Sequence, residues 1–315
     1  MPVKALDRST PTALPTALPA VLAAAAVLLA ACLGCTPAAG QGAGRPYRAP
    51  TAAEQDTLEH AESLLVGACM KDRGYRYTVV PPAQQPPVPP DFPYGIDDAE
   101  FARSHGFGTD LDLQVTRRAA TDPNRSYARS LGSARGTGYA QALTGTAGKR
   151  ITVTLPSGFR IATNTTGCLA QARRTLYGDH PAWFAATRTA ENLKAVYQAR
   201  TRKDPAYAAA VRKWSACMSG RGWQVKDLEA LRMQASAASH RAPTRRQLAH
   251  ERAAAGAEAE CVRATGLVAV ALRVEEPYRT RLEQTHAAAV RTRDRLAAAA
   301  LPRARELVAE AGTGS

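Results

Sequence analysis

The sequence predicts a mostly helical domain of two disulfide-linked pseudo-repeats, with a small β-hairpin inserted in the first. Three observations support this fold class. Hydrophobic residues make up 45% of the chain but aromatic ones only 6%, and much of the apolar share is alanine, the residue with the highest helix propensity. The spacing of the segment Cys69–Tyr75 recurs in Cys217–Trp223. One short segment, residues 151–161, alternates in the manner of paired strands.

The N-terminus has the features of an exported lipoprotein. After a basic start, the apolar stretch Ala20–Ala31 is shorter than the roughly 20 residues that a membrane span needs. It runs into the sequence Leu-Ala-Ala-Cys at Leu29–Cys32, which resembles the lipobox of bacterial lipoproteins. We therefore expect residues 1–31 to be a signal peptide. Cys32 is then the lipid attachment site and holds the chain at the extracytoplasmic face of the cell membrane.

A tether is predicted between the lipid and the folded domain. Residues 32–54 are assigned to it because Thr36–Pro50 is rich in Gly, Ala and Pro and shows no apolar periodicity. Cys35 is a rival lipidation site, but it lacks an aliphatic residue three positions upstream. A buried N-terminal helix is disfavoured because three prolines precede the apolar stretch.

The other four cysteines form the predicted disulfide framework. Export places them in an oxidising compartment, where disulfides persist, and four cysteines allow three connectivities. Cys69 and Cys217 come late in predicted helices, whereas Cys168 and Cys261 come early in others. Side-by-side packing of such helices favours the pairs Cys69–Cys168 and Cys217–Cys261. No histidine cluster accompanies them, so we expect no metal site.

The repeated motif has a structural interpretation. Each copy closes a predicted helix, residues 55–73 and 205–221. Gly74 and Gly222 stand where a left-handed helix cap is expected. Arg73 and Arg221 would lie in the last turn, where a positive charge is favourable against the helix dipole.

The first repeat, residues 55–204, contains the insertion. Val79–Pro93 is rich in proline and predicted to be extended. Asp97 or Asp98 can cap a short helix that Gly106 ends, and residues 123–143 have apolar side chains at helical spacing. Two strands, Ile151–Leu155 and Phe159–Ile161, then flank a turn, and helices follow at 168–177 and 181–202.

The second repeat, residues 205–310, is predicted to end in one long helix that begins at Ala242–Thr244. Pro277 should kink or split this helix, and the tail after Glu310 should fray. The apolar stripe of the helix includes Cys261, Val268, Leu272, Leu282 and Leu296.

Several segments of residues 55–295 together resemble a group of uncharacterised secreted lipoproteins of actinobacterial type. The resemblance implies export and the cysteine framework, and it implies no chemistry. The segments that carry it are Cys69-Met70 with Gly74-Tyr75, Tyr94-Gly95, Gly167-Cys168-Leu169 with Leu176-Tyr177-Gly178-Asp179, Trp214 with Cys217-Met218 and Gly222-Trp223, and Cys261 with Thr265-Gly266-Leu267.

No catalytic constellation is predicted, and no cofactor is expected. The G-x-S-x-G and H-E-x-x-H motifs are absent from the sequence. Adjacent carboxylates, Asp97/Asp98 and Glu275/Glu276, do not face one another on a helix. The histidines are scattered and are interpreted as exposed or capping residues: His60, His105, His180, His240, His250 and His286.

Three functions are compatible with these features. The leading hypothesis is a non-enzymatic binding or scaffolding role at the cell envelope, with an envelope protein as a possible partner. The alternatives are an envelope polymer hydrolase that uses acidic residues and an arginine-mediated binder of anionic wall polymer or lipid. A net charge of +14 favours acidic partners. No basic run is interleaved with aromatics, so we expect no nucleic acid partner.

Overall fold

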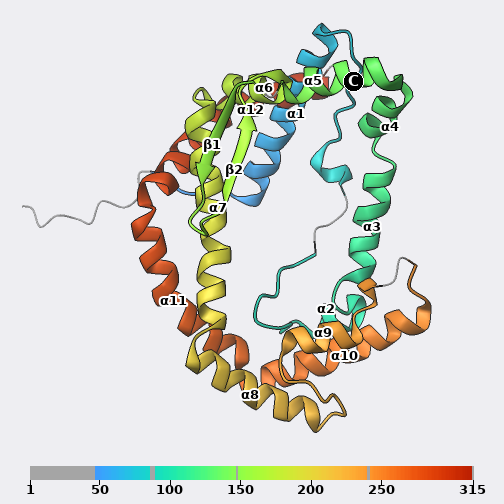
Figure 1. The fold of residues 1–315 in the computed structure, drawn as a ribbon, viewed down its shortest axis with the longest axis vertical. Coiled ribbons are helices and arrows are strands. Elements are labelled where there is room, and N and C mark those ends of the chain that lie inside the picture. Colours follow the sequence, from blue (N-terminus) through green and yellow to red (C-terminus); the bar gives the residue numbers. More distant parts are fainter. Residues whose placement is uncertain (1–46, 86–88, 147, 240–241, 314–315) are drawn as a thin grey trace, which may run out of the picture. The chain divides into compact units, whose positions relative to one another are not determined.

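The computed structural model describes residues 47–85, 89–146, 148–239 and 242–313. The predicted signal peptide, Cys32, Cys35 and most of the tether lie outside these ranges. Residues 45–315 form one compact unit. The described part is mostly helical with a two-stranded hairpin, as predicted (Figure 1). Within these ranges, no helix has the length and hydropathy needed to cross a membrane.

The elements, in chain order, are α1 (Ala52–Asp72), η1 (Pro82–Gln84), α2 (Ala99–His105), α3 (Thr109–Ala120), α4 (Pro123–Ser130), α5 (Gly132–Thr144), β1 (Arg150–Thr154), β2 (Arg160–Asn164), α6 (Gly167–Tyr177), α7 (His180–Arg202), α8 (Pro205–Ser219), α9 (Leu228–Ala235), η2 (Ala237–Ser239), α10 (Arg245–Thr265), α11 (Leu267–Thr285) and α12 (Ala287–Thr313).

Side chains cap the predicted helix starts. Asp98 accepts two hydrogen bonds of 2.9 Å from backbone N–H groups at the start of α2. This helix ends at Gly106, as predicted. Helix α1 begins at Ala52, three residues before its predicted start, because Thr51 and Glu54 form a capping box.

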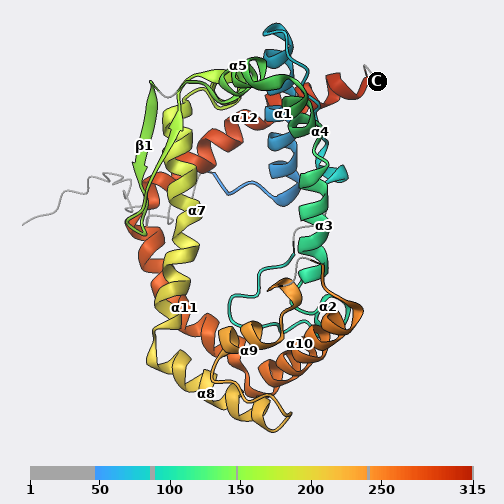
Figure 2. The ribbon, with the colours of Figure 1, turned by 45° about the vertical axis from the view of Figure 1, so that its right-hand side comes forward.

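Helices α1, α6, α7 and α12 pack around one apolar core, and the ribbon shows α12 beside α1 and α7 (Figures 1 and 2). Helix α12 belongs to the predicted second repeat, yet it packs against α1, α6 and α7 of the first. The predicted second repeat therefore contributes to the same core as the predicted first one. Its buried side chains include Leu58, Leu176, Tyr177, Trp183, Leu296 and Leu301.

A second core lies where α8, α10 and α11 meet. Trp214 and Met218 of α8 are fully buried there against Val262 and Leu267. Tyr94 also packs into this core, although it belongs to the insertion in the first repeat. Its hydroxyl donates a 2.5 Å hydrogen bond to the buried Glu275 of α11. The insertion is thus an integral part of the second core.

The hairpin forms close to its predicted position. β1 and β2 pair antiparallel, with Val153 opposite Ile161. The turn between them places Gly158 at φ 89°, a left-handed conformation that glycine adopts without steric penalty. Each strand begins or ends one to three residues away from its predicted bounds.

The prediction that the long C-terminal helix breaks at Pro277 is wrong. The chain forms three helices that are separated at Gly266 and His286, whereas Pro277 lies exposed within α11. Gly266 adopts φ 65° and ends α10, as a glycine cap does. The predicted stripe residue Leu272 is 53% exposed, and the predicted frayed tail is helical to Thr313. The buried positions of α11 are Leu267, Ala271, Glu275 and Leu282.

Candidate functional site

The repeated cysteine motif closes two helices by the same backbone geometry. Gly74 and Gly222 have φ of 76° and 86°. The N–H of Tyr75 donates to the carbonyl of Met70 at 2.9 Å, and Trp223 donates to Met218 at 3.0 Å. These are the long hydrogen bonds of a Schellman cap. Both methionines are fully buried, so the motif is structural, as predicted.

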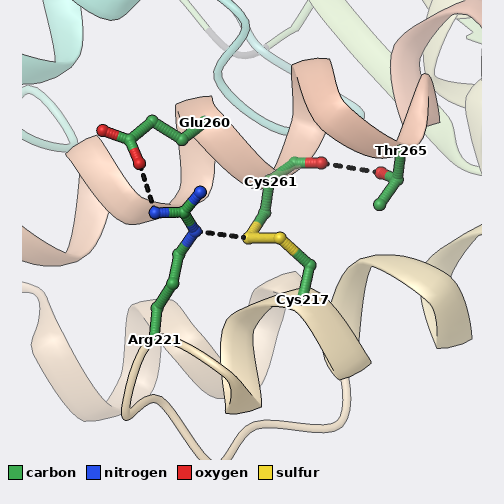
Figure 3. Close-up of a disulfide and its surroundings, with 5 residues drawn as sticks. All are labelled: Cys217, Arg221, Glu260, Cys261 and Thr265. Carbon is green, nitrogen blue, oxygen red and sulfur yellow. Dashed lines mark hydrogen bonds and ion pairs between the residues drawn. A yellow bond between two sulfur atoms is a disulfide. The ribbon is translucent and has the colours of Figure 1, made fainter.

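Both predicted disulfides are present, Cys69–Cys168 between α1 and α6 and Cys217–Cys261 between α8 and α10. In Figure 3, Arg221 donates from Nε to the Cys261 sulfur at 3.2 Å and pairs with Glu260. Arg221 lies beyond the end of α8. The prediction that it occupies the last helical turn is therefore wrong, and it contacts the neighbouring helix instead.

A buried carboxylate, Glu251, joins α10 to two distant segments. It accepts hydrogen bonds from the Phe107 N–H at 3.0 Å, the Thr109 hydroxyl at 2.6 Å and the Ala237 N–H at 2.5 Å. A Cβ on Gly106 would lie 2.8 Å from Glu251, so this close approach requires glycine. The set of donors explains how a carboxylate can be 1% exposed.

Glu258, two turns further along α10, is buried with weaker partners. The Ile96 N–H and the Arg232 guanidinium both lie 3.4 Å from Oε1. Oε2 is buried without a hydrogen-bond partner among the described residues. Burial raises the pKa of this carboxyl to about 7, and Arg232 and the Ile96 N–H only partly offset the shift.

We predict that Glu258→Gln changes the pH dependence of stability. Because the pKa of Glu258 is about 7 in the fold against 4.5 ordinarily, the folded chain holds a proton that the unfolded chain loses between these values. Stability is therefore lost as the pH rises through this window. Glutamine does not titrate, so this loss is absent in the variant. Its free energy of unfolding should exceed that of the wild type by up to about 3 kcal/mol above pH 7.

Urea denaturation at several pH values between about 4 and 8 measures this difference. Glu229→Gln, which alters an exposed carboxylate of α9, is the matched control. Its free energy of unfolding should change with pH in the same way as that of the wild type. A Glu258→Gln profile that also runs parallel to wild type would contradict the assignment.

The prediction that every histidine is exposed or capping is wrong for His180. This residue occupies the first position of α7 but is 1% exposed, and both ring nitrogens lack hydrogen-bond partners among the described residues. Burial lowers its pKa, and Arg173 and Arg174 lower it further. His105 is partly buried and lies 2.9 Å from Asp110. His240 falls outside the described residues.

A large groove lies along α8 and α9, with a volume of about 1060 Å³. We call it the basic groove. Its apolar lining comes from Phe92, Pro93, Tyr207, Val211, Leu228 and Met233. Its charged lining comprises the cations Arg202, Arg212, Lys226 and Arg232 and the acids Asp227 and Glu229. Four cations against two acids leave the lining net positive, although Arg232 also lies beside the buried Glu258.

A smaller cavity of about 400 Å³ lies among α1, α6 and α7. We call it the polar cavity. Its charged lining comprises Glu59, His60, Glu62, Arg173, Arg188 and Glu191, beside the aromatic side chains Tyr77, Tyr177, Trp183 and Phe184. Burial raises the pKa of Glu62, and Arg173 opposes the shift. The hydrolase hypothesis stays a prediction, and these carboxylates are where it would apply.

Sequence reasoning found neither cavity, since both are assembled from segments far apart in the chain. Among the described residues, no group of three or more His, Cys, Asp or Glu side chains is placed to hold a metal ion. Comparison of the chain with family models, curated proteins and solved structures gave no match.

Proposed function

We propose that this protein is an extracytoplasmic lipoprotein with a non-enzymatic binding role, and that the basic groove binds an anionic amphiphile. The observation that carries the proposal is the composition of the groove, an apolar lining with four cations against two acids. A ligand with an apolar chain and a carboxylate or phosphate head group matches both parts. A hydrophilic wall polymer would leave the apolar lining without a partner.

Size and adaptability also favour such a ligand. The volume of about 1060 Å³ is at the upper end of the usual range for small-molecule sites. Met233, which is 74% exposed, has a flexible and polarisable side chain suited to irregular apolar ligands. A lipid-anchored protein would also lie next to a membrane that supplies amphiphiles.

Oleate is the probe that tests this proposal. The full chain, immobilised in a non-ionic, sugar-free detergent, should retain radiolabelled oleate, and retention should fall between about 50 and about 500 mM NaCl. Arg202→Glu with Arg212→Glu should weaken retention about tenfold, because two favourable rim charges become repulsive.

The control is Lys213→Glu, which reverses one charge at an exposed residue of α8 outside the groove lining. It should bind oleate like the wild type. Equal retention of oleyl alcohol, or retention that is insensitive to both salt and the arginine changes, would overturn the proposal.

A further inference from the structure

The polar cavity presents paired charges. Arg173 Nε lies 2.9 Å from Glu62 Oε1, and the side chains are 23% and 18% exposed. Arg188 lies 2.7 Å from Glu191, and Glu59 accepts a 2.9 Å hydrogen bond from Gln55. Both arginines already have a counter-charge, and of these carboxylates only Glu59 has a neutral partner, so a charged ligand gains less here than it would from unpaired ions.

The two members of an ion pair can still form further hydrogen bonds. A carboxylate accepts several hydrogen bonds and a guanidinium has five N–H donors, so each pair still offers acceptors and donors to a third group. The cavity lining therefore provides both kinds of partner with little net charge. Hydroxyl groups donate and accept at once, and they suit such a lining better than an ion does.

Aromatic rings supply the apolar part of the same cavity. Tyr177 and Trp183 stack with their ring centroids 3.8 Å apart and an interplanar angle of 11°. Both rings line the cavity although they are less than 10% exposed, so packing holds them rigidly. The two rings cover one face of each other, so it is the small exposed part of the stack that offers an apolar contact to the C–H groups of a sugar.

We propose that the polar cavity binds a neutral saccharide of one or two rings. Its hydroxyls hydrogen-bond to the ion pairs Arg173–Glu62 and Arg188–Glu191, and its C–H groups contact the exposed part of the Tyr177–Trp183 stack. A volume of about 400 Å³ matches a ligand of this size. The inference is independent of the basic groove, since no residue lines both sites.

The full chain in a sugar-free detergent is titrated with three probes, di-N-acetylchitobiose, maltose and trehalose, by calorimetry and saturation-transfer NMR. We expect at least one to bind with a dissociation constant of about 1 mM or lower. Arg188→Ala and Glu191→Gln should each weaken it by about tenfold, because each removes hydrogen bonds to a charged group. Both residues are exposed, so both variants should fold.

Arg200→Ala is the control, an exposed arginine of the same helix outside the cavity. It should bind the saccharide like the wild type. Three results would overturn the proposal: none of the three probes binds, the cavity variants bind as tightly as the wild type, or free alanine and lysine bind in their place.

Discussion

Loss of the Cys69–Cys168 bridge, in the double variant Cys69→Ala with Cys168→Ala, should lower the free energy of unfolding by about 5 kcal/mol. The two residues are 99 positions apart. In the chain-entropy model, a loop of that length restricts the unfolded chain strongly. Cys168 is fully buried and Cys69 nearly so, and alanine would leave space behind in the core.

Loss of the second bridge should cost less. Cys217 and Cys261 are 44 positions apart, which gives about 4 kcal/mol in the same model. Denaturant titration of the exported, unreduced protein measures both values, with Cys35→Ser as the control that should leave stability unchanged. A double variant that unfolds at the wild-type denaturant concentration would show that its bridge contributes nothing.

The features that the sequence predicted correctly are local ones. A glycine after a helical run, as at Gly74 and Gly222, satisfies the orphan carbonyl groups of a helix end, whatever packs around it. The cap at Asp98 follows the same rule. The disulfide pairing was predicted from a cysteine late in one helix packing beside a cysteine early in another. Both pairs are present, but the predicted position is wrong for Cys261, which lies near the end of α10.

The C-terminal helices show how a local pattern can give a wrong helix boundary. Pro277 was predicted to kink or split the helix, but the chain breaks at Gly266 and His286 instead. An exposed proline costs a helix one hydrogen bond and can be tolerated, whereas Gly266 supplies the left-handed cap of α10. Helix α12 then turns back to pack on α1 and α7, a choice that depends on long-range packing and has no sequence signal.

Glu251 and Glu258 show the same limit at the candidate sites. On α10 both lie at helical spacing with the buried Ala254, Ala255 and Val262, so the pattern marks their face as buried but not the groups that satisfy their charge. The donors that make this possible, Phe107, Thr109 and Ile96, come from about 140 to 160 positions earlier in the chain. The basic groove likewise joins the insertion to α8 and α9. No periodicity in a single helix reveals such partners.

Replacement of the predicted lipidation site, Cys32→Ala, should abolish fatty-acid labelling of the protein and its retention in the membrane. A diacylated cysteine would carry two long acyl chains, and each buried CH₂ contributes about 0.8 kcal/mol, so two chains anchor stably where one binds only marginally. Without the thiol, neither lipid attachment nor normal processing can occur. The product should be an uncleaved precursor or a soluble secreted domain.

The two disulfides provide an internal control for this experiment. They should form in Cys32→Ala as in the wild type, because they depend on an oxidising compartment and not on the lipid. Intact mass and metabolic fatty-acid labelling distinguish the outcomes. Label that persists in Cys32→Ala but disappears in Cys35→Ala would move the anchor to Cys35. A wild-type protein that takes up no label would refute the lipoprotein assignment, while the fold and both cavities, which lie beyond the predicted lipidation site, would be unaffected.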